Sequence, residues 1–186
     1  NYNTVVGDEA GTAITTGDGN VAVGYSAGDA LDVGSYNIAV GMNALTADTK
    51  GSTSIAIGYG TLTAQNFTSA TDAHNIAIGH GTGGAVTTGT FNTLIGGLAG
   101  DGATTASYST ALGYGSLGGA MTGEGNVALG VNTLLVATSA HSNTAVGTSA
   151  MSSATTGTNN VAVGRNALDA NTTASNNTAV GYDALG

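Results

Sequence analysis

The three histidines of the chain, His74, His80 and His141, are the residues best able to bind a metal or to move a proton near neutral pH. His74 and His80 flank one predicted strand, and a three-chain assembly would bring three copies of each together, so a metal on the assembly axis is one alternative. Their spacing matches no established ligand motif. We therefore expect exposed turn residues and no bound metal or cofactor.

Acidic residues offer a second kind of chemistry, but they are scattered singly, and Asp8–Glu9 is the only adjacent pair. The segments GDGN (17–20) and GEGN (123–126) are similar to glycine-rich calcium turns, although the nine-residue period of such turns is missing. No phosphate-binding loop of the form Gly-x-x-x-x-Gly-Lys-(Ser/Thr) is present. The sequence therefore predicts solvated corners rather than calcium sites, and it predicts that the protein is not an enzyme.

Aromatic and threonine side chains could bind a ligand along a repeated surface. Exposed tyrosines can stack on sugar rings, although tyrosines that cover seams or a subunit interface are the favoured interpretation. Five Thr-Thr pairs raise ice binding as an alternative, but adjacent residues of a strand point to opposite faces, so ordinary strand threonines are favoured. The candidate ligand surface consists of Tyr25, Tyr59, Tyr114 and Tyr182, with Asn66 and Phe67 in the one irregular segment.

Composition excludes several classes of partner. Only 7% of the 186 residues are charged, and the two basic residues, Lys50 and Arg165, face eleven acidic ones, for a net charge of −9. Nucleic-acid binding requires clustered Lys and Arg, and the same deficit argues against contact with an anionic membrane. Without cysteine, neither disulfides nor thiol chemistry is available.

The organisation of the chain is a repeat of the form Asn-x-Ala-(Val/Ile/Leu)-Gly. Nine of the ten intervals between its glycines are 17 residues long, and the interval from Gly58 to Gly79 is 21. Such regularity predicts a single repeat domain over residues 1–186, with an insertion in the coil 58–79. Ser54 and Ser109 replace the asparagine in two copies. The repeat columns that we expect to stack are Asn20, Asn37, Asn75, Asn92, Asn126, Asn143, Asn160 and Asn177, and Gly24, Gly41, Gly58, Gly79, Gly96, Gly113, Gly130, Gly147, Gly164 and Gly181.

A 17-residue unit without helical periodicity predicts strands. Branched residues alternate with alanine before each glycine, as in Val21-Ala22-Val23, so the two kinds of side chain point to opposite faces. We assign the branched face, Val146 included, to the interior of the coil and the alanine face to the outside. The glycine supplies a corner at positive φ, and the asparagines form an amide ladder between coils.

A second apolar column lies four residues after the glycine, as in Leu45 and Leu117. Where this position holds glycine, as at Gly28 and Gly83, an apolar residue follows three positions later. This exchange suggests one cavity filled from either position, since a core is packed to nearly constant volume. Two apolar sites per turn predict an all-β chain folded as a β-solenoid of eleven coils, with two short strands in each and a length of about 50 Å.

A coil this thin buries few side chains, so additional contacts are needed to stabilise it. A strip of outward alanine is small and flat, and it would suit close packing against copies of the chain. We therefore expect the chain's partner to be itself, as a homotrimer.

The repeat Asn-x-Ala-Val-Gly-x-x-Ala-Leu resembles the head repeats of YadA-like trimeric autotransporter adhesins, and its variants NTAVGTSAM and NVAVGRNAL resemble repeats of phage tail fibres. The likeness runs from Asn3 to Leu185. It implies a left-handed parallel β-roll, assembled as a trimer in an extracellular fibre on a cell or virion surface. It also implies attachment to a glycan or protein receptor on a host surface, and we expect the chain to be one segment of a longer fibre protein. A glycan- or ice-binding module that uses a repeated solenoid face is the alternative.

Overall fold

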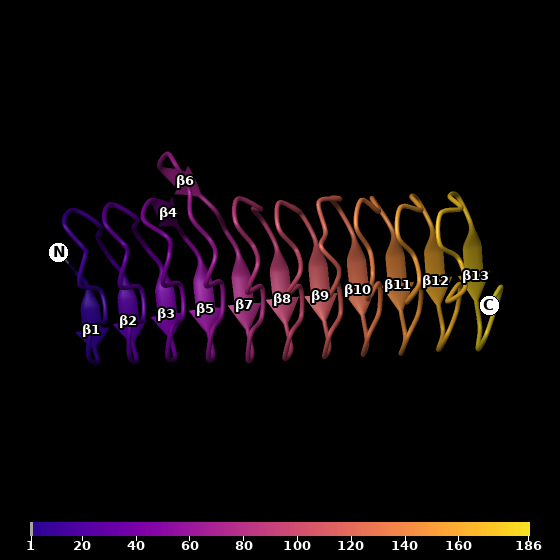
Figure 1. Cartoon of the computed structure of the whole chain (residues 1–186), viewed down its shortest axis with the longest axis horizontal. Coiled ribbons are helices and arrows are strands. Elements are labelled where there is room, and N and C mark those ends of the chain that lie inside the picture. Colours follow the sequence, from indigo (N-terminus) through magenta and orange to yellow (C-terminus); the bar gives the residue numbers. More distant parts are fainter. Residues whose placement is uncertain (1) are drawn as a thin grey trace.

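The computed structural model describes residues 2–186, which form a rod of stacked coils with the two ends of the chain at opposite ends of the rod (Figure 1). Each coil contributes one three-residue strand to a parallel sheet of eleven strands. A two-stranded sheet lies beside it, formed by β4 (Gly51–Ser52) and β6 (Thr71–Asp72). The main strands are β1 (Thr4–Val6), β2 (Val21–Val23), β3 (Ile38–Val40), β5 (Ile55–Ile57), β7 (Ile76–Ile78), β8 (Thr93–Ile95), β9 (Thr110–Leu112), β10 (Val127–Leu129), β11 (Thr144–Val146), β12 (Val161–Val163) and β13 (Thr178–Val180).

Equivalent residues of successive coils lie directly over one another. Ala22 pairs with Ala39, and Ala56 pairs with Ala77 across the insertion, so the four extra residues leave the register unchanged. The predicted β-solenoid, with its 17-residue period, is confirmed.

The repeat glycines form the corner that follows each strand, and two constraints require glycine there. Their φ angles run from 124° to 136°, a region that side chains other than glycine rarely adopt. A Cβ at Gly24 would also lie 2.7 Å from both the carbonyl carbon and the oxygen of Gly41 in the next coil. Stacked coils therefore come too close at this corner to admit any side chain.

Apart from β4 and β6, the coils of residues 2–186 have no second strand of the kind predicted. A tight return limb, the residues that follow each corner glycine, takes its place. In that limb, the position four residues after the glycine is left-handed, with φ values of 55° at Leu45 and 48° at Leu62. Coils remain hydrogen-bonded there, since Leu45 N donates to Thr61 O over 2.9 Å. A left-handed position in every coil also explains why glycine can alternate with leucine.

The face assignment of the strand is wrong. The alanine column points inward, with Ala22, Ala39 and Ala56 at 0% exposure, whereas the branched residues point outward, with Leu112 at 45%. Val146 is likewise a partly exposed outward residue. The return limb carries the large side chains into the narrow interior, which leaves only the volume of a methyl group for the strand.

The shared cavity is confirmed, and it has a third source of side-chain volume. A Cβ at Gly28 would lie 2.8 Å from Leu31 Cδ1, so Leu31 fills the space that leucine fills elsewhere. In the coil with Gly100 and Ala103, both of those positions are small, and Leu94 replaces the strand alanine. A Cβ at Gly100 would lie 2.8 Å from Leu94 Cδ2, and Leu94 is 1% exposed. The strand alanine position and two positions of the return limb, four and seven residues after the corner glycine, therefore fill one shared volume inside the coil.

The asparagine column joins successive coils, mainly by contacts from side chain to backbone. Asn37 Nδ2 donates to Gly51 O over 2.9 Å, and Asn37 Oδ1 accepts the Ser54 N–H over 2.9 Å. Direct amide–amide bonds are added in later coils, as from Asn143 Nδ2 to Asn126 Oδ1 over 3.1 Å. Each buried asparagine therefore satisfies both a donor and an acceptor of the next turn.

Candidate functional site

The outward strand residues form an aliphatic strip, which we define as the first and third residues of every main strand. All its members are Val, Ile, Leu or Thr, and none is charged. Ile57, Leu129 and Val163 are 36%, 37% and 36% exposed, and residues at the two ends of the rod are exposed further. Eleven strands at about 4.8 Å give a continuous apolar band roughly 50 Å long, which is large for the surface of a monomer.

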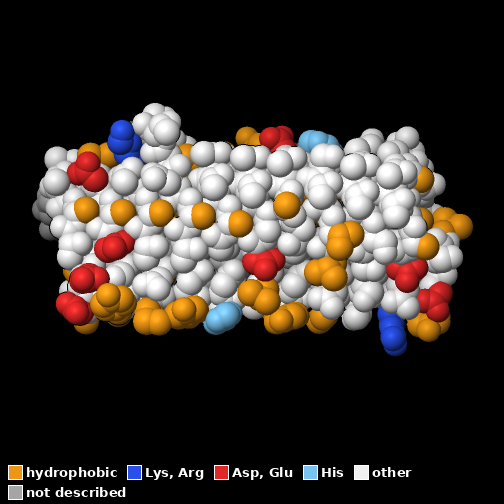
Figure 2. All heavy atoms as spheres, viewed as in Figure 1, with side chains coloured by type: hydrophobic (Ala, Val, Ile, Leu, Met, Phe, Trp, Pro, Cys, Tyr) orange, Lys and Arg blue, Asp and Glu red, His pale blue; other side chains and the backbone are white. Residues whose placement is uncertain are grey.

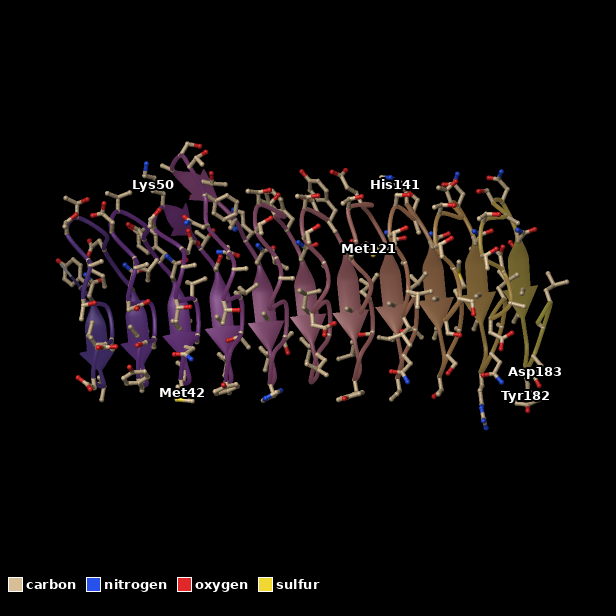
Figure 3. All side chains as sticks on the ribbon, viewed as in Figure 1. Met42, Lys50, Met121, His141, Tyr182 and Asp183 are labelled. Atoms are coloured by element: carbon tan, nitrogen blue, oxygen red, sulfur yellow. The ribbon has the colours of Figure 1, made fainter. Side chains whose placement is uncertain are left out.

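The four tyrosines of the predicted ligand surface lie along the glycine edge, which we define as the residues directly after the corner glycines. Met42 and Tyr182 mark this edge at the bottom of the rod (Figure 3), where hydrophobic side chains gather in the space-filling view (Figure 2). Tyr25, Tyr59 and Tyr114 are 48%, 49% and 56% exposed. The glycine edge continues directly from the aliphatic strip, because only the corner glycine separates their residues.

A different aromatic row lies on the opposite edge, the loop edge, where Lys50 and His141 are labelled (Figure 3). The rings of His74 and Phe91 are 5.0 Å apart, and those of Phe91 and Tyr108 are stacked at 5.2 Å with an interplanar angle of 6°. These residues directly precede the asparagine column, and all three are left-handed, with φ between 50° and 58°. The chain therefore has two aromatic edges, one of which borders the aliphatic strip.

The insertion rises from the loop edge at β4 and β6 (Figure 1), and a buried polar cluster lies at its base. Asp48 is fully buried, and its carboxylate accepts hydrogen bonds from Gln65 Nε2 over 2.6 Å and from Gly51 N over 2.8 Å. Gln65 Nε2 also donates to Ser54 Oγ over 3.0 Å, and Gln65 Oε1 accepts from Asn75 Nδ2 over 2.8 Å. Gln65 thus reaches into the column where Ser54 replaces asparagine.

Sequence reasoning missed this cluster, although the missing asparagine at Ser54 was a usable signal. It also placed Phe67 on the ligand surface, whereas Phe67 is buried with 6% exposure and presents no ring to a ligand. Asn66 is exposed, as expected of a loop residue, but its Oδ1 accepts a hydrogen bond from Thr49 Oγ1 over 3.1 Å. Met121 is a further missed core residue, fully buried one position beyond the usual column.

Burial raises the pKa of Asp48 above its ordinary value, against the opposing hydrogen bonds from Gln65, Gly51 and Lys50. Burial also raises the pKa of Asp101. The backbone hydrogen bond from Tyr2 lowers the pKa of the exposed carboxyl of Asp18. Asp48 is thus the carboxyl whose environment departs most from water.

The other candidate ligand groups are already engaged within the protein. His80 stacks on Tyr59 at 5.2 Å, and residues 2–186 contain no group of three His, Cys, Asp or Glu side chains that could hold a metal. Thr87 and Thr155 donate their hydroxyl hydrogens to Thr104 O and Thr172 O of the next coil, over 3.1 and 3.0 Å. The threonine column therefore strengthens the stacking of the coils.

Comparison with protein-family models, with curated proteins and with solved structures finds no match. Over the described part of the chain, no helix is long and apolar enough to cross a membrane. The repeat and the surfaces of the rod are therefore the basis for a functional assignment.

Proposed function

We propose that the chain is a rigid segment of an extracellular homotrimeric fibre, an adhesin head or a tail-fibre shaft, that mediates attachment by holding a binding surface away from the base of the fibre. The aliphatic strip carries this proposal. An apolar band along the whole rod needs a partner of the same length and period, and a second copy of the chain is one. The likeness to YadA-like head repeats and to tail-fibre repeats supports the three-fold arrangement and the place outside the cell.

The strip, rather than the alanine column, is the surface that packs between copies. It has no charge, so chains with a net charge of −9 can approach along it with little repulsion. The length of the strip and the width of two side chains give it an area of about 500 Å². The apolar residues of the glycine edge enlarge this area towards the roughly 800 Å² that each partner buries in a standard interface. Packing strip against strip also leaves the return limb and the loop edge open.

The rod is suited to bearing load between its ends. Every strand of the main sheet except β1 and β13 is paired on both sides, so the main sheet has unpaired edges only at the ends of the rod. Hydrogen bonds at the corner glycines and along the asparagine column also join each coil to the next. A fibre built this way transmits force through many parallel hydrogen bonds.

The test compares two leucines of one coil with equal exposure. Leu129 belongs to the strip, Leu135 lies on the return limb, and both are 37% exposed. In sedimentation equilibrium we expect a three-chain mass for the wild type and for Leu135→Asp. We expect 17.7 kDa, the mass of one chain, for Leu129→Asp, with an unchanged far-ultraviolet circular dichroism spectrum.

A wild type that stays monomeric at 100 µM or above would overturn the proposal, as would a trimer that survives Leu129→Asp. A two-chain mass would overturn the three-fold arrangement. Val146→Asp tests the same surface, because Val146 points outward and not into the core.

A further inference from the structure

The stack of His74, Phe91 and Tyr108 ends at a gap. Tyr108, Gly125 and Ser142 hold the same place in successive coils, since their N–H groups donate to Thr90 O, Ser107 O and Glu124 O, each over 3.0 Å. Gly125 has no side chain to continue the stack. The next side chain of this column, Ser142, is two coils from Tyr108, or about 10 Å along the rod.

This gap, the Gly125 notch, is open. A Cβ placed on Gly125 would have a single neighbour within 4 Å, Ser142 Oγ at 3.7 Å, so the Tyr108 ring does not lean into it. Gly19 occupies the same column, but a Cβ there would lie 2.8 Å from Tyr36 Cδ1, so the Tyr36 ring covers that gap. The Gly125 notch therefore exposes one face of Tyr108, whose other face packs on Phe91, and Tyr108 is 61% exposed.

Polar groups of two kinds border the notch. Glu124, directly before Gly125, is exposed and offers carboxylate oxygens as acceptors. The Glu124 N–H donates to His141 Nδ1 over 3.0 Å, so the other ring nitrogen, Nε2, carries the proton and can act as a donor. Hydrophobic, acidic and histidine side chains follow one another on this edge in the space-filling view (Figure 2), and His141 is labelled there in Figure 3.

We propose that the Gly125 notch binds one pyranose ring of a neutral saccharide. The ring takes the place of the missing side chain and packs its C–H face on the electron-rich face of Tyr108, about 5 Å away. Glu124 accepts hydrogen bonds from its hydroxyls, and His141 Nε2–H donates one. The net charge of −9, with Glu124 at the site, disfavours anionic sugars.

A single notch is a shallow site, because the described residues enclose no pocket, and its dissociation constant for one sugar is on the order of 1 mM. Three chains in a fibre would present three notches and bind a branched or surface-bound glycan more tightly. The site itself lies within one chain, so it does not depend on the proposed trimer.

Saturation-transfer NMR tests the proposal with the methyl pyranosides of glucose, galactose, mannose and N-acetylglucosamine, and with sialic acid as the anionic comparison. We expect at least one neutral sugar to bind and sialic acid to give no signal. Tyr108→Ala should weaken binding at least tenfold. Gly125→Tyr should abolish it by extending the stack, and its backbone suits this change, because Gly125 has φ +69° and Tyr108 φ +56°.

Tyr36→Ala is the matched control, because Tyr36 is an exposed tyrosine of the same column without the open notch. The Tyr36→Ala variant should bind the neutral sugar with the affinity of the wild type. The Leu129→Asp variant should retain single-site binding, which separates this proposal from the fibre proposal. The proposal is overturned if no neutral sugar binds, if Gly125→Tyr binds like the wild type, or if Tyr36→Ala loses affinity as much as Tyr108→Ala.

Discussion

Removal of the Leu94 side chain should create a cavity that a second substitution on the opposite limb can fill. Leu94 is 1% exposed, and Gly100 and Ala103 cannot fill its space because both are small. Leu94→Ala should therefore lower the free energy of unfolding by about 3 kcal/mol, the usual cost of a leucine truncation that leaves a cavity. Gly100→Leu alone should cost about 1–3 kcal/mol, since a Cβ at Gly100 would lie 2.8 Å from Leu94 Cδ2.

The double variant Leu94→Ala/Gly100→Leu should be close to the wild type. Gly100 has φ +60°, and Leu45 and Leu117 occupy the equivalent position with φ values of 55°, so the backbone already suits leucine. If the double variant costs less than about 1 kcal/mol, the two sites are coupled by roughly 3 kcal/mol or more, which is large for a contacting pair.

The assay is urea unfolding, followed by circular dichroism at one fixed protein concentration because association would contribute to stability. All four proteins are compared on the Leu129→Asp background to remove that contribution. A double variant whose loss equals the sum of the two single losses would refute the shared volume.

Two further predictions concern the polar interior. The pKa of Asp48 is raised in the folded chain, so folding favours its protonated form; this contribution is complete below the unfolded pKa near 4 and is lost as pH rises through the folded pKa. In urea titrations, the unfolding free energy of the wild type minus that of Asp48→Asn should therefore increase as pH falls from 7 to 4. The shifted carboxyls of Asp18 and Asp101 are present in both proteins, so their contributions cancel in this difference. A difference that does not change with pH would contradict the burial argument. Asn143→Ala should lower the free energy of unfolding by about 2–4 kcal/mol, because it leaves Gly157 O and the Asn160 N–H without their hydrogen bonds of 2.8 and 2.9 Å. Asn143→Ser, the residue found at position 109, should cost less, and a loss under about 0.5 kcal/mol for Asn143→Ala in the same urea assay would count against the proposed role of the asparagine column.

Part of the structure followed from local rules that the sequence displays directly. The interval between glycines predicted the stacking of coils, because only an ordered repeat keeps eleven glycines in phase. The exchange between Gly28 and Leu31 predicted a shared cavity, since packing conserves volume. The asparagine column predicted polar contacts between coils, although the structure shows that most of them run to the backbone.

The candidate sites were less accessible to such rules. The tyrosines of the glycine edge were found from their spacing, but the Gly125 notch depends on which way the rings of Tyr36 and Tyr108 lean. Asp48 and Gln65 lie 17 residues apart, so the repeat register brings them together, but the further contacts of Gln65 with Ser54 and Asn75 depend on how the coil folds. No short-range pattern specifies either arrangement.

The sequence by itself therefore determined the period, the corner and the columns of this protein. Only the tertiary structure decided which face of the strand lies inside. A two-residue alternation of valine and alanine is apolar on both faces, so the pattern alone does not choose between them. The choice is made by the return limb, whose leucines occupy the narrow interior and leave room there for a methyl group, except at Leu94, where the opposite limb is small.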